Sequence, residues 1–130
     1  MRAMLNQTVD YSRQRVQFGV PISSFQVLQH RMVDLHILQE ETRALTAAAQ
    51  DALDHNAPDR ARIVSGAMAY ISRAARKVAN EAIQMHGGIG ITEELEVSHY
   101  YRRIMVINNL FGSRDQHFVR FLSHSGAPWA

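Results

Sequence analysis

Two stretches of the chain combine a helix-ending glycine with polar or cationic side chains. Residues 13–19 read Arg-Gln-Arg-Val-Gln-Phe-Gly, and residues 84–90 read Gln-Met-His-Gly-Gly-Ile-Gly. Glycine lets a backbone approach a ligand closely, and an arginine guanidinium is a charged, forked donor that suits phosphate oxygens. This arrangement can hold a phosphate-bearing cofactor. Because the two stretches lie far apart in sequence, only the fold can bring them together.

The composition indicates one domain made mainly of helices. The chain has 130 residues, 46% of them hydrophobic, which is enough to bury a core. Its long alanine-rich segments without proline favour helix over sheet. The sequence contains no cysteine, which excludes disulfides, thiolate nucleophiles and cysteine metal ligands. We therefore expect a single all-α domain over residues 1–130.

The sequence carries no targeting or anchoring signal. No apolar run approaches the length that spans a membrane, and residues 1–6 lack the apolar core of a signal peptide. The absence of cysteine is compatible with a reducing compartment. The expected location is the bacterial cytoplasm, with no membrane partner.

Charge and histidine spacing argue against nucleic acid and metal ligands. The 14 basic and 12 acidic residues leave a formal net charge of only +2. The basic group Arg73, Arg76 and Lys77 is short, lacks any accompanying nucleic-acid-binding motif, and is interpreted as a solvated helix face. No two of the seven histidines stand four residues apart, the spacing that places two ligands on one helix face. We expect neither a nucleic-acid partner nor a metal site.

Apolar periodicity predicts five helical segments, at about residues 2–17, 25–54, 59–85, 92–112 and 113–123. Two helices near thirty residues joined by a short turn should pair antiparallel. The remaining helices would complete an up-and-down four-helix bundle, followed by an irregular tail over residues 126–130. The predicted fold class is therefore all-α.

Local signals define the ends of these segments. Ser23 or Ser24 would cap the second helix. Gly87 and Gly88 would supply the left-handed turn after the third. Thr92, followed by acidic residues, would begin the fourth. The first helix begins without a capping residue before its apolar positions, so we expect a C-terminal fragment of a larger protein.

Three blocks of sequence resemble the acyl-CoA dehydrogenase family, in its C-terminal helical domain. Residues 11–22 and 25–26 resemble the family's Tyr…Arg-x-Gln-Phe-Gly-x-x-Ile…Gln pattern. Residues 82–90 resemble its Gln-x-x-Gly-Gly-x-Gly turn, and residues 101–102 resemble the Tyr-Arg-Asp that precedes the final active-site turn. The blocks span nearly the whole chain in the right order and spacing. Each block alone is weak, but together they are specific.

The resemblance implies a bundle that binds FAD together with two other domains. Each flavin of the family lies across a subunit interface, which implies a homo- or hetero-oligomer. Arg15 would pair with the pyrophosphate, Phe18 would pack against the cofactor, and Gln84 would hydrogen-bond it. The remaining contacts of this group would come from the backbone of Met85, His86, Gly87 and Gly88, with Phe25 and Gln26 close by.

The family reaction is α,β-dehydrogenation of an acyl-CoA thioester, in which a carboxylate removes the α-proton and flavin N5 accepts the β-hydride. The glutamate of most members stands just before a Gly-Thr pair that begins the last helix. Here Phe111 occupies that position, followed by Gly112 and Ser113. A phenyl ring has no proton to exchange, so Phe111 cannot be the base. Ser113 can still donate a hydrogen bond to the flavin or ribityl groups, and Asp115 falls where the family often has Glu or Gln.

Three explanations for the missing base stay open. It can lie on the helix that begins this domain, upstream of Met1. The chain can be the non-catalytic subunit of a heteromeric dehydrogenase, which oligomerises and completes a partner's flavin site. The protein can also be a relative with altered chemistry. Apart from these three, the chain can be a helical bundle with an unrelated binding role. In each case we expect the 130-residue chain alone to be inactive, because it lacks the domains that hold the flavin ring and cover the thioester.

Overall fold

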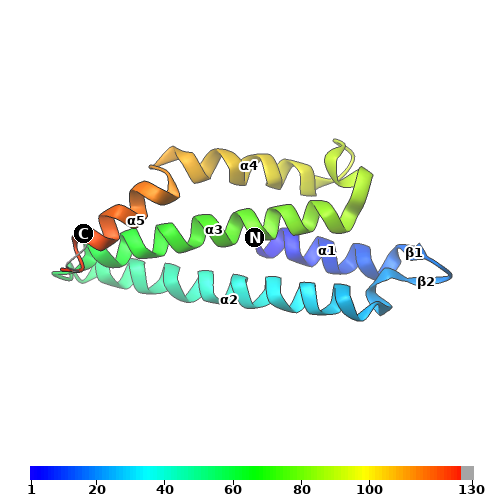
Figure 1. The fold of residues 1–130 in the computed structure, drawn as a ribbon, viewed down its shortest axis with the longest axis horizontal. Coiled ribbons are helices and arrows are strands. Elements are labelled where there is room, and N and C mark those ends of the chain that lie inside the picture. Colours follow the sequence, from blue (N-terminus) through cyan, green and yellow to red (C-terminus); the bar gives the residue numbers. More distant parts are fainter. Residues whose placement is uncertain (127–130) are drawn as a thin grey trace.

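Five α-helices and a short hairpin make up the part of the chain that the computed structural model describes, residues 1–126. In chain order the elements are α1 (Arg2–Gln14), β1 (Val16–Gln17), β2 (Val20–Pro21), the 3₁₀ turn η1 (Ile22–Ser24), α2 (Gln26–Asp54), α3 (Arg60–His86), the 3₁₀ turn η2 (Gly87–Ile91), α4 (Glu96–Leu110) and α5 (Arg114–Ser123). Successive helices run up and down an elongated bundle, with α4 and α5 sharing one direction (Figure 1). The predicted all-α, up-and-down bundle is confirmed. Apart from Gly126, the predicted irregular tail lies outside the described residues.

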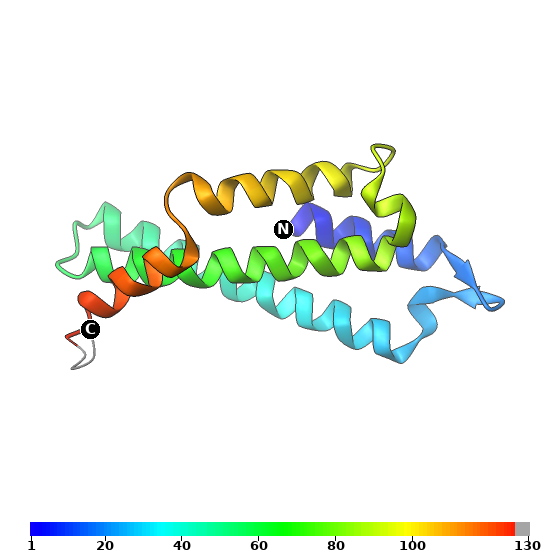
Figure 2. The ribbon, with the colours of Figure 1, turned by 45° about the horizontal axis from the view of Figure 1, so that its top comes forward.

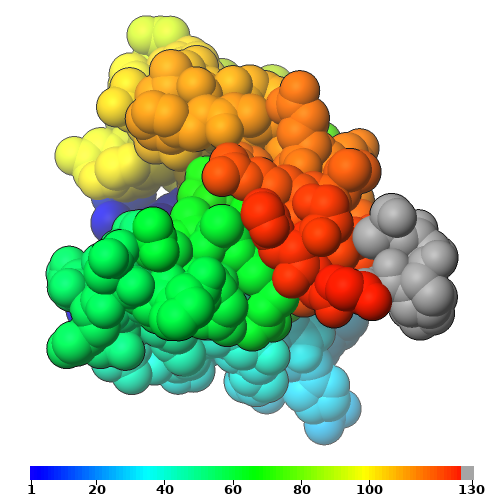
Figure 3. All heavy atoms as spheres, turned by 90° about the vertical axis from the view of Figure 1, so that its left-hand side faces the viewer, coloured from blue at the N-terminus to red at the C-terminus, as the bar shows by residue number. Residues whose placement is uncertain are grey.

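The long helix α3 is the one against which the other helices pack. α2 returns antiparallel to it, α1 and α4 lie along its C-terminal half, and α5 lies along its N-terminal half (Figures 1 and 2). Seen from the end where α2 passes into α3, α5 lies beside α3 with α4 above them (Figure 3). Small side chains face these contacts, because Ala67, Ala74, Ala75, Ala79 and Ala82 are all buried. Alanine costs no rotamer entropy in a helix and lets neighbouring backbones approach closely.

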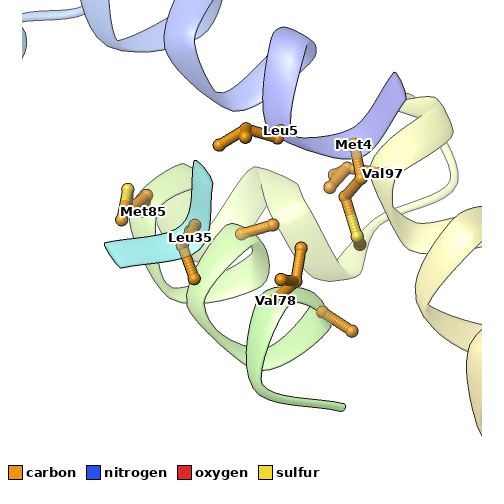
Figure 4. Packing of buried hydrophobic residues seen from close by; sticks show 8 residues of the cluster. Met4, Leu5, Leu35, Val78, Met85 and Val97 are labelled. Atoms are coloured by element: carbon orange, nitrogen blue, oxygen red, sulfur yellow. The ribbon is translucent and has the colours of Figure 1, made fainter. Parts of the chain in front are cut away.

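The centre of the core lies where four helices meet. Met4 and Leu5 of α1 point toward Leu35 of α2, Val78 of α3 and Val97 of α4 (Figure 4). Each of these side chains is at most 5% exposed. Burying a side chain of this size stabilises the fold by roughly 1.5–3 kcal/mol. The core therefore fixes α1, which is only 13 residues long, in one position against the bundle.

A β-hairpin replaces the last predicted turn of the first helix. Arg15 has an extended backbone (φ −75°, ψ 115°) and ends α1. Residues 16–17 then pair antiparallel with residues 20–21. Phe18 (φ 54°) and Gly19 (φ 81°) form the two-residue loop between them, with the positive φ at both positions that a tight hairpin turn requires. The prediction of helix through residue 17 was wrong, because β-branched residues on both sides of this loop favour paired strands.

The second helix begins without the predicted serine cap. Its N-cap is Phe25, which makes no side-chain cap hydrogen bond. Ser23 and Ser24 lie in η1 instead, where the Ser24 hydroxyl donates to the Pro21 carbonyl at 2.6 Å. The Gln29 side-chain amide donates back to the Ser23 carbonyl at 2.9 Å. The serine cap prediction was wrong because this hydroxyl bonds backward into the preceding turn.

The glycines after α3 have different roles. Gly87 has the positive φ (66°) that was predicted for the turn, whereas Gly88 does not. Gly90 is held against the end of the helix, where an added Cβ would lie 2.9 Å from His86 Cβ and 3.0 Å from the Ile83 carbonyl oxygen. Ordinary Cβ atoms do not approach backbone oxygen so closely, so this third glycine is sterically required.

The fourth helix begins later than predicted, at Glu96 instead of Thr92. The Thr92 hydroxyl donates to the Ile89 carbonyl at 2.9 Å, which closes η2 and does not cap a following helix. Of the acidic residues Glu93, Glu94 and Glu96 that follow Thr92, only Glu96 lies in the first turn of the helix. Glu93 precedes the helix and forms an ion pair with Arg102 at 2.9 Å.

A sharp elbow separates α4 from α5. Gly112 has φ 106°, which favours glycine. Ser113 then caps α5, with its hydroxyl accepting from the backbone amide of Gln116 at 3.3 Å and its own backbone amide donating to the Gln116 side chain at 2.8 Å. On the other side of the elbow, the buried Asn108 side chain donates to the Ser72 carbonyl of α3 at 3.0 Å.

Gly66 in the interior of α3 gives a test of the α3–α5 contact. A Cβ at this position would lie 2.9 Å from Cδ2 of Phe121. Replacing a helical glycine by alanine ordinarily stabilises a protein by up to about 1 kcal/mol. In the native protein we expect Gly66→Ala to give no gain in stability, because the Phe121 ring must move to make room for the methyl group. In a Phe121→Ala background we expect the same substitution to give the full gain. Urea unfolding of the four variants measures this, and an equal gain in both backgrounds would contradict the packing.

Candidate functional site

An aromatic stack joins the C-terminal ends of α1 and α3. The rings of Tyr11 and His86 stack with centroids 4.4 Å apart and planes 28° apart. The Tyr11 hydroxyl donates to the His86 carbonyl at 3.3 Å, and His86 Nδ1 lies 2.8 Å from the Ala82 carbonyl. Arg15 follows Tyr11 by one turn, and Gln84 precedes His86 by two residues. The stack therefore brings both predicted cofactor stretches to the same end of the bundle (Figures 1 and 2).

Arg15 is held by its backbone and exposes its side chain. Its amide donates to the Tyr11 carbonyl at 2.8 Å, and its carbonyl accepts from the Ile22 amide at 2.8 Å. Within residues 1–126 its guanidinium takes part in no ion pair. An anchored backbone with an unpaired guanidinium leaves all five N–H donors available to a phosphate.

Phe18 presents an aromatic ring to solvent from a strained backbone position. It is 92% exposed and has φ 54°, which is uncommon for a residue other than glycine. Its ring makes an edge-to-face contact with Phe25, with centroids 6.2 Å apart and planes 84° apart. Gln26, the first residue of α2, is exposed next to this pair. An aromatic side chain that is exposed and stands at a strained backbone position supports a binding role.

Gln84 lies on the outer face of α3 and lines a hollow of about 380 Å³. The hollow is closed on its other sides by Gly90 and Ile91 of η2 and by Tyr101 and Arg102 of α4. Sequence reasoning did not place Tyr101 and Arg102 in the site, although their resemblance to the Tyr-Arg-Asp block was a signal that could have done so. The amide, phenol and guanidinium groups make this hollow suited to a polar, planar ligand group.

Residues 85–88, at the end of α3 and the start of η2, form what we call the glycine turn. Its main chain is accessible to a ligand, whereas its side chains are not. Met85 and His86 are 7% and 6% exposed, so their side chains belong to the core. Gly87 and Gly88 are exposed, and an added Cβ at either position would meet nothing within 4 Å. Open space over two glycines gives a ligand room to reach the main chain. A flavin nucleotide fits this end of the bundle, in that the turn is accessible and Arg15 provides an unpaired cation.

Ser113 and Asp115 lie elsewhere, in a groove of about 570 Å³ at the elbow between α4 and α5. We call this the elbow groove; its walls are α3, the end of α4 and the start of α5. Ser113 is occupied as the cap of α5, while Asp115 is 84% exposed and pairs with Arg114 at 3.2 Å. The elbow groove reaches from Ser72 to Glu81 along α3 and shares Asn80 with the hollow at Gln84. Ser72 and Gln84 are separated by roughly 18 Å of helix.

Phe111 ends α4 as its C-cap residue, with a side chain that is 72% exposed. Acids in the neighbouring elements already have partners. Glu81 pairs with Arg31 of α2, and Glu96 accepts from Gln7 at 2.7 Å and from Tyr100 at 3.1 Å. The hydrogen bond to Glu96 raises the pKa of Tyr100, because it stabilises the protonated phenol, and the negative charge of the carboxylate adds to this effect. These acids tie helices together and none stands in the position of a catalytic base at Phe111.

Other kinds of site find no support in the described residues. Within residues 1–126 no three metal-ligating side chains come together. Of the helices in the same range, none is both long and apolar enough to cross a membrane.

Comparisons with known proteins agree on one family. The family model described as acyl-CoA dehydrogenase, C-terminal domain, matches residues 1–119. Acyl-CoA dehydrogenase IpdE2 of Mycolicibacterium smegmatis is 42% identical over 101 residues, which cover 76% of this chain and 30% of that protein. The probable acyl-CoA dehydrogenase YngJ of Bacillus subtilis is 35% identical over 101 residues, covering 78% of this chain and 26% of that protein.

Solved structures show the same likeness. The acyl-CoA dehydrogenase of Geobacillus kaustophilus superimposes with a TM-score of 0.90 at 28% identity, covering 97% of this chain and 33% of that one. Butyryl-CoA dehydrogenase of Megasphaera elsdenii gives a TM-score of 0.88 at 29% identity, with coverages of 94% and 32%. The chain therefore belongs to the acyl-CoA dehydrogenase family, whose members are FAD-dependent oxidoreductases, and corresponds to the C-terminal domain. It spans less than a third of the length of these curated relatives.

The Tyr11–His86 stack can be tested by two substitutions. Tyr11→Phe keeps the ring and removes one hydrogen bond, which should cost about 1 kcal/mol of unfolding free energy. Tyr11→Ala removes the ring as well and should cost roughly 3 kcal/mol or more. Denaturant unfolding measures both. Equal stabilities of the two variants would contradict a role of the stack in holding α1 on α3.

Proposed function

We propose that this chain is the C-terminal part of an FAD-dependent dehydrogenase that introduces an α,β double bond into acyl-CoA thioesters. The observation that carries the proposal is the family match over residues 1–119 together with the accessible glycine turn beside Arg15. The proposal extends to a longer protein, because the matched relatives are more than three times the length of the aligned segment.

In this proposal FAD supplies the hydride acceptor, and the residues of this chain position the nucleotide. Arg15 neutralises the diphosphate with charge-assisted hydrogen bonds, which are roughly twice as strong as neutral ones. The exposed Phe18 ring packs against an apolar part of the cofactor. Gln84 and the main chain of residues 85–88 orient the nucleotide through hydrogen bonds. Ser113 and Asp115 contact a flavin from the elbow groove.

The proposed site is divided between two subunits. Gln84 and Ser113 line two different hollows, which adjoin at Asn80 of α3. The family resemblance implies a flavin that lies across a subunit interface, so one flavin would meet the group around Arg15 and Gln84 of one subunit and the group around Ser113 of another. Exposed apolar side chains near the elbow support a covered surface. They are Val106, Ile107, Leu110, Phe111, Phe118 and Val119.

A non-catalytic role is the second candidate. The chain would then complete the flavin site of a different, catalytic subunit in a hetero-oligomer. Phe111 favours this alternative, because it occupies the usual glutamate position and has no proton to exchange. The two candidates share the fold and the cofactor residues, and they differ only in where the catalytic base lies.

Cofactor binding is tested with Arg15→Ala and Gln84→Ala in the complete gene product. Loss of a charge-assisted hydrogen bond of about 1.5–3 kcal/mol corresponds to roughly 10- to 100-fold weaker binding. We expect a weakening of this size for FAD with Arg15→Ala, and a smaller one with Gln84→Ala. Flavin absorbance after equilibrium dialysis measures it. Arg13→Ala is the control, since Arg13 is exposed and faces Asp10 at 3.8 Å; an equal loss in the control would contradict the assignment.

The position of the base is tested with Phe111→Ala and a panel of acyl-CoA thioesters. If the base lies elsewhere in the same chain, the complete gene product dehydrogenates a thioester, and Phe111→Ala keeps kcat/KM within a few-fold with an unchanged pH profile. If the product is inactive alone but becomes active on addition of a catalytic subunit, the second candidate holds. Activity that is lost only on replacing Phe111, without loss of flavin, would contradict both.

A further inference from the structure

The elbow groove gathers more positive charge than the proposed flavin contacts explain. Arg73, Arg76 and Lys77 line it from α3, and Arg114 lines it from α5. The two acids in its lining are already neutralised, Glu81 by Arg31 and Asp115 by Arg114. Within residues 1–126 the three α3 cations take part in no ion pair. The described part of the groove therefore carries three uncompensated charges.

These three cations share one side of the helix. Arg73 stands three residues before Arg76 and four before Lys77, which places the side chains next to each other. Like charges at these spacings destabilise a helix by a few tenths of a kcal/mol per pair. None of the ion pairs in residues 1–126 offsets that cost. A bound anion would offset it, because one multiply charged group can pair with all three side chains.

The groove also supplies neutral donors for an anion. Asn80 and Asn109 line it beside the cations. Ser113 lines it at the N-terminus of α5, where the helix dipole favours negative charge. With a volume of about 570 Å³ the elbow groove is larger than a single phosphate needs. Its size and charge suit a diphosphate with part of the group attached to it.

We infer that the elbow groove binds the diphosphate of an adenosine-diphosphate group through Arg73, Arg76 and Lys77. The inference rests on the proposed function, which brings two ligands that contain this group. One is the flavin nucleotide, whose diphosphate would then lie between Arg15 of one subunit and the elbow groove of another, and the other is the acyl-CoA thioester. Guanidinium groups give forked hydrogen bonds to phosphate oxygens, and Lys77 contributes a compact point charge. This assigns a binding role to a basic cluster that the sequence alone indicated to be a solvated helix face.

The test uses the double variant Arg76→Gln/Lys77→Gln in the complete gene product. Glutamine keeps length and helix propensity while it removes the charge. The matched control is Arg43→Gln/Arg62→Gln, which removes the same net charge from cations that form local ion pairs with Glu40 and Asp59 outside the groove. Isothermal titration calorimetry with inorganic pyrophosphate is carried out at low and at physiological ionic strength. We expect at least about tenfold weaker binding in the groove variant, no change in the control, and weaker wild-type binding as salt rises.

Equal pyrophosphate affinity in the two variants, or no binding to the wild type, would overturn the inference. Two further arms distinguish the source of the group. A lower FAD affinity of the groove variant with unchanged KM for the thioester assigns the flavin, and a raised KM with unchanged FAD affinity assigns the thioester. Unchanged values of both overturn the assignment to adenosine diphosphate. If the wild type holds FAD and dehydrogenates thioesters, and the groove variant behaves like the control, the proposed function stands. Only the inference about the elbow groove is then overturned.

Discussion

The close approach of α3 to every other helix is the constraint on which the rest of the structure depends. Its buried face is built from alanines, so four partner helices can contact one helix that is 27 residues long. Where even a methyl group would be too large, glycine takes its place, as at Gly66 beneath the ring of Phe121. The outer face of the same helix is left free to carry polar groups. Position along α3 therefore decides which functional side chains become neighbours.

Two regions of polar surface result from this arrangement. At the C-terminal end of α3 the Tyr11–His86 stack holds the hairpin with Arg15 beside the glycine turn. Toward the middle of α3 the elbow of α4 and α5 forms a groove over a row of cations. Asn80 lines both the elbow groove and the hollow at Gln84, so these two are adjacent on one face of the molecule. A nucleotide and its phosphates can contact this face without disturbing the core, because the core residues lie on the opposite side of α3.

The sequence predicted the fold well where periodicity was long. The segments that became α2 and α3 were placed within one residue of their observed ends. Short elements were less predictable. The hairpin at residues 16–21 was missed, because the turn needs a positive φ at residue 18, and phenylalanine is not a residue type that predicts one. The serine cap failed because Ser24 bonds to a preceding carbonyl, a choice that depends on how η1 folds back on α1.

The candidate site, like the fold, was predictable from the sequence only in part. The family resemblance was enough to predict Arg15 and Gln84 as cofactor residues, and the residue type marked Phe111 as unable to exchange a proton. Only the tertiary structure decided that Tyr101 and Arg102 share a hollow with Gln84, and that a basic cluster on α3 faces the start of α5. The sequence by itself determined the helices and the chemical groups, since both follow from local periodicity and side-chain type. The neighbours of those groups were decided by packing between helices far apart in the chain, which no local pattern encodes.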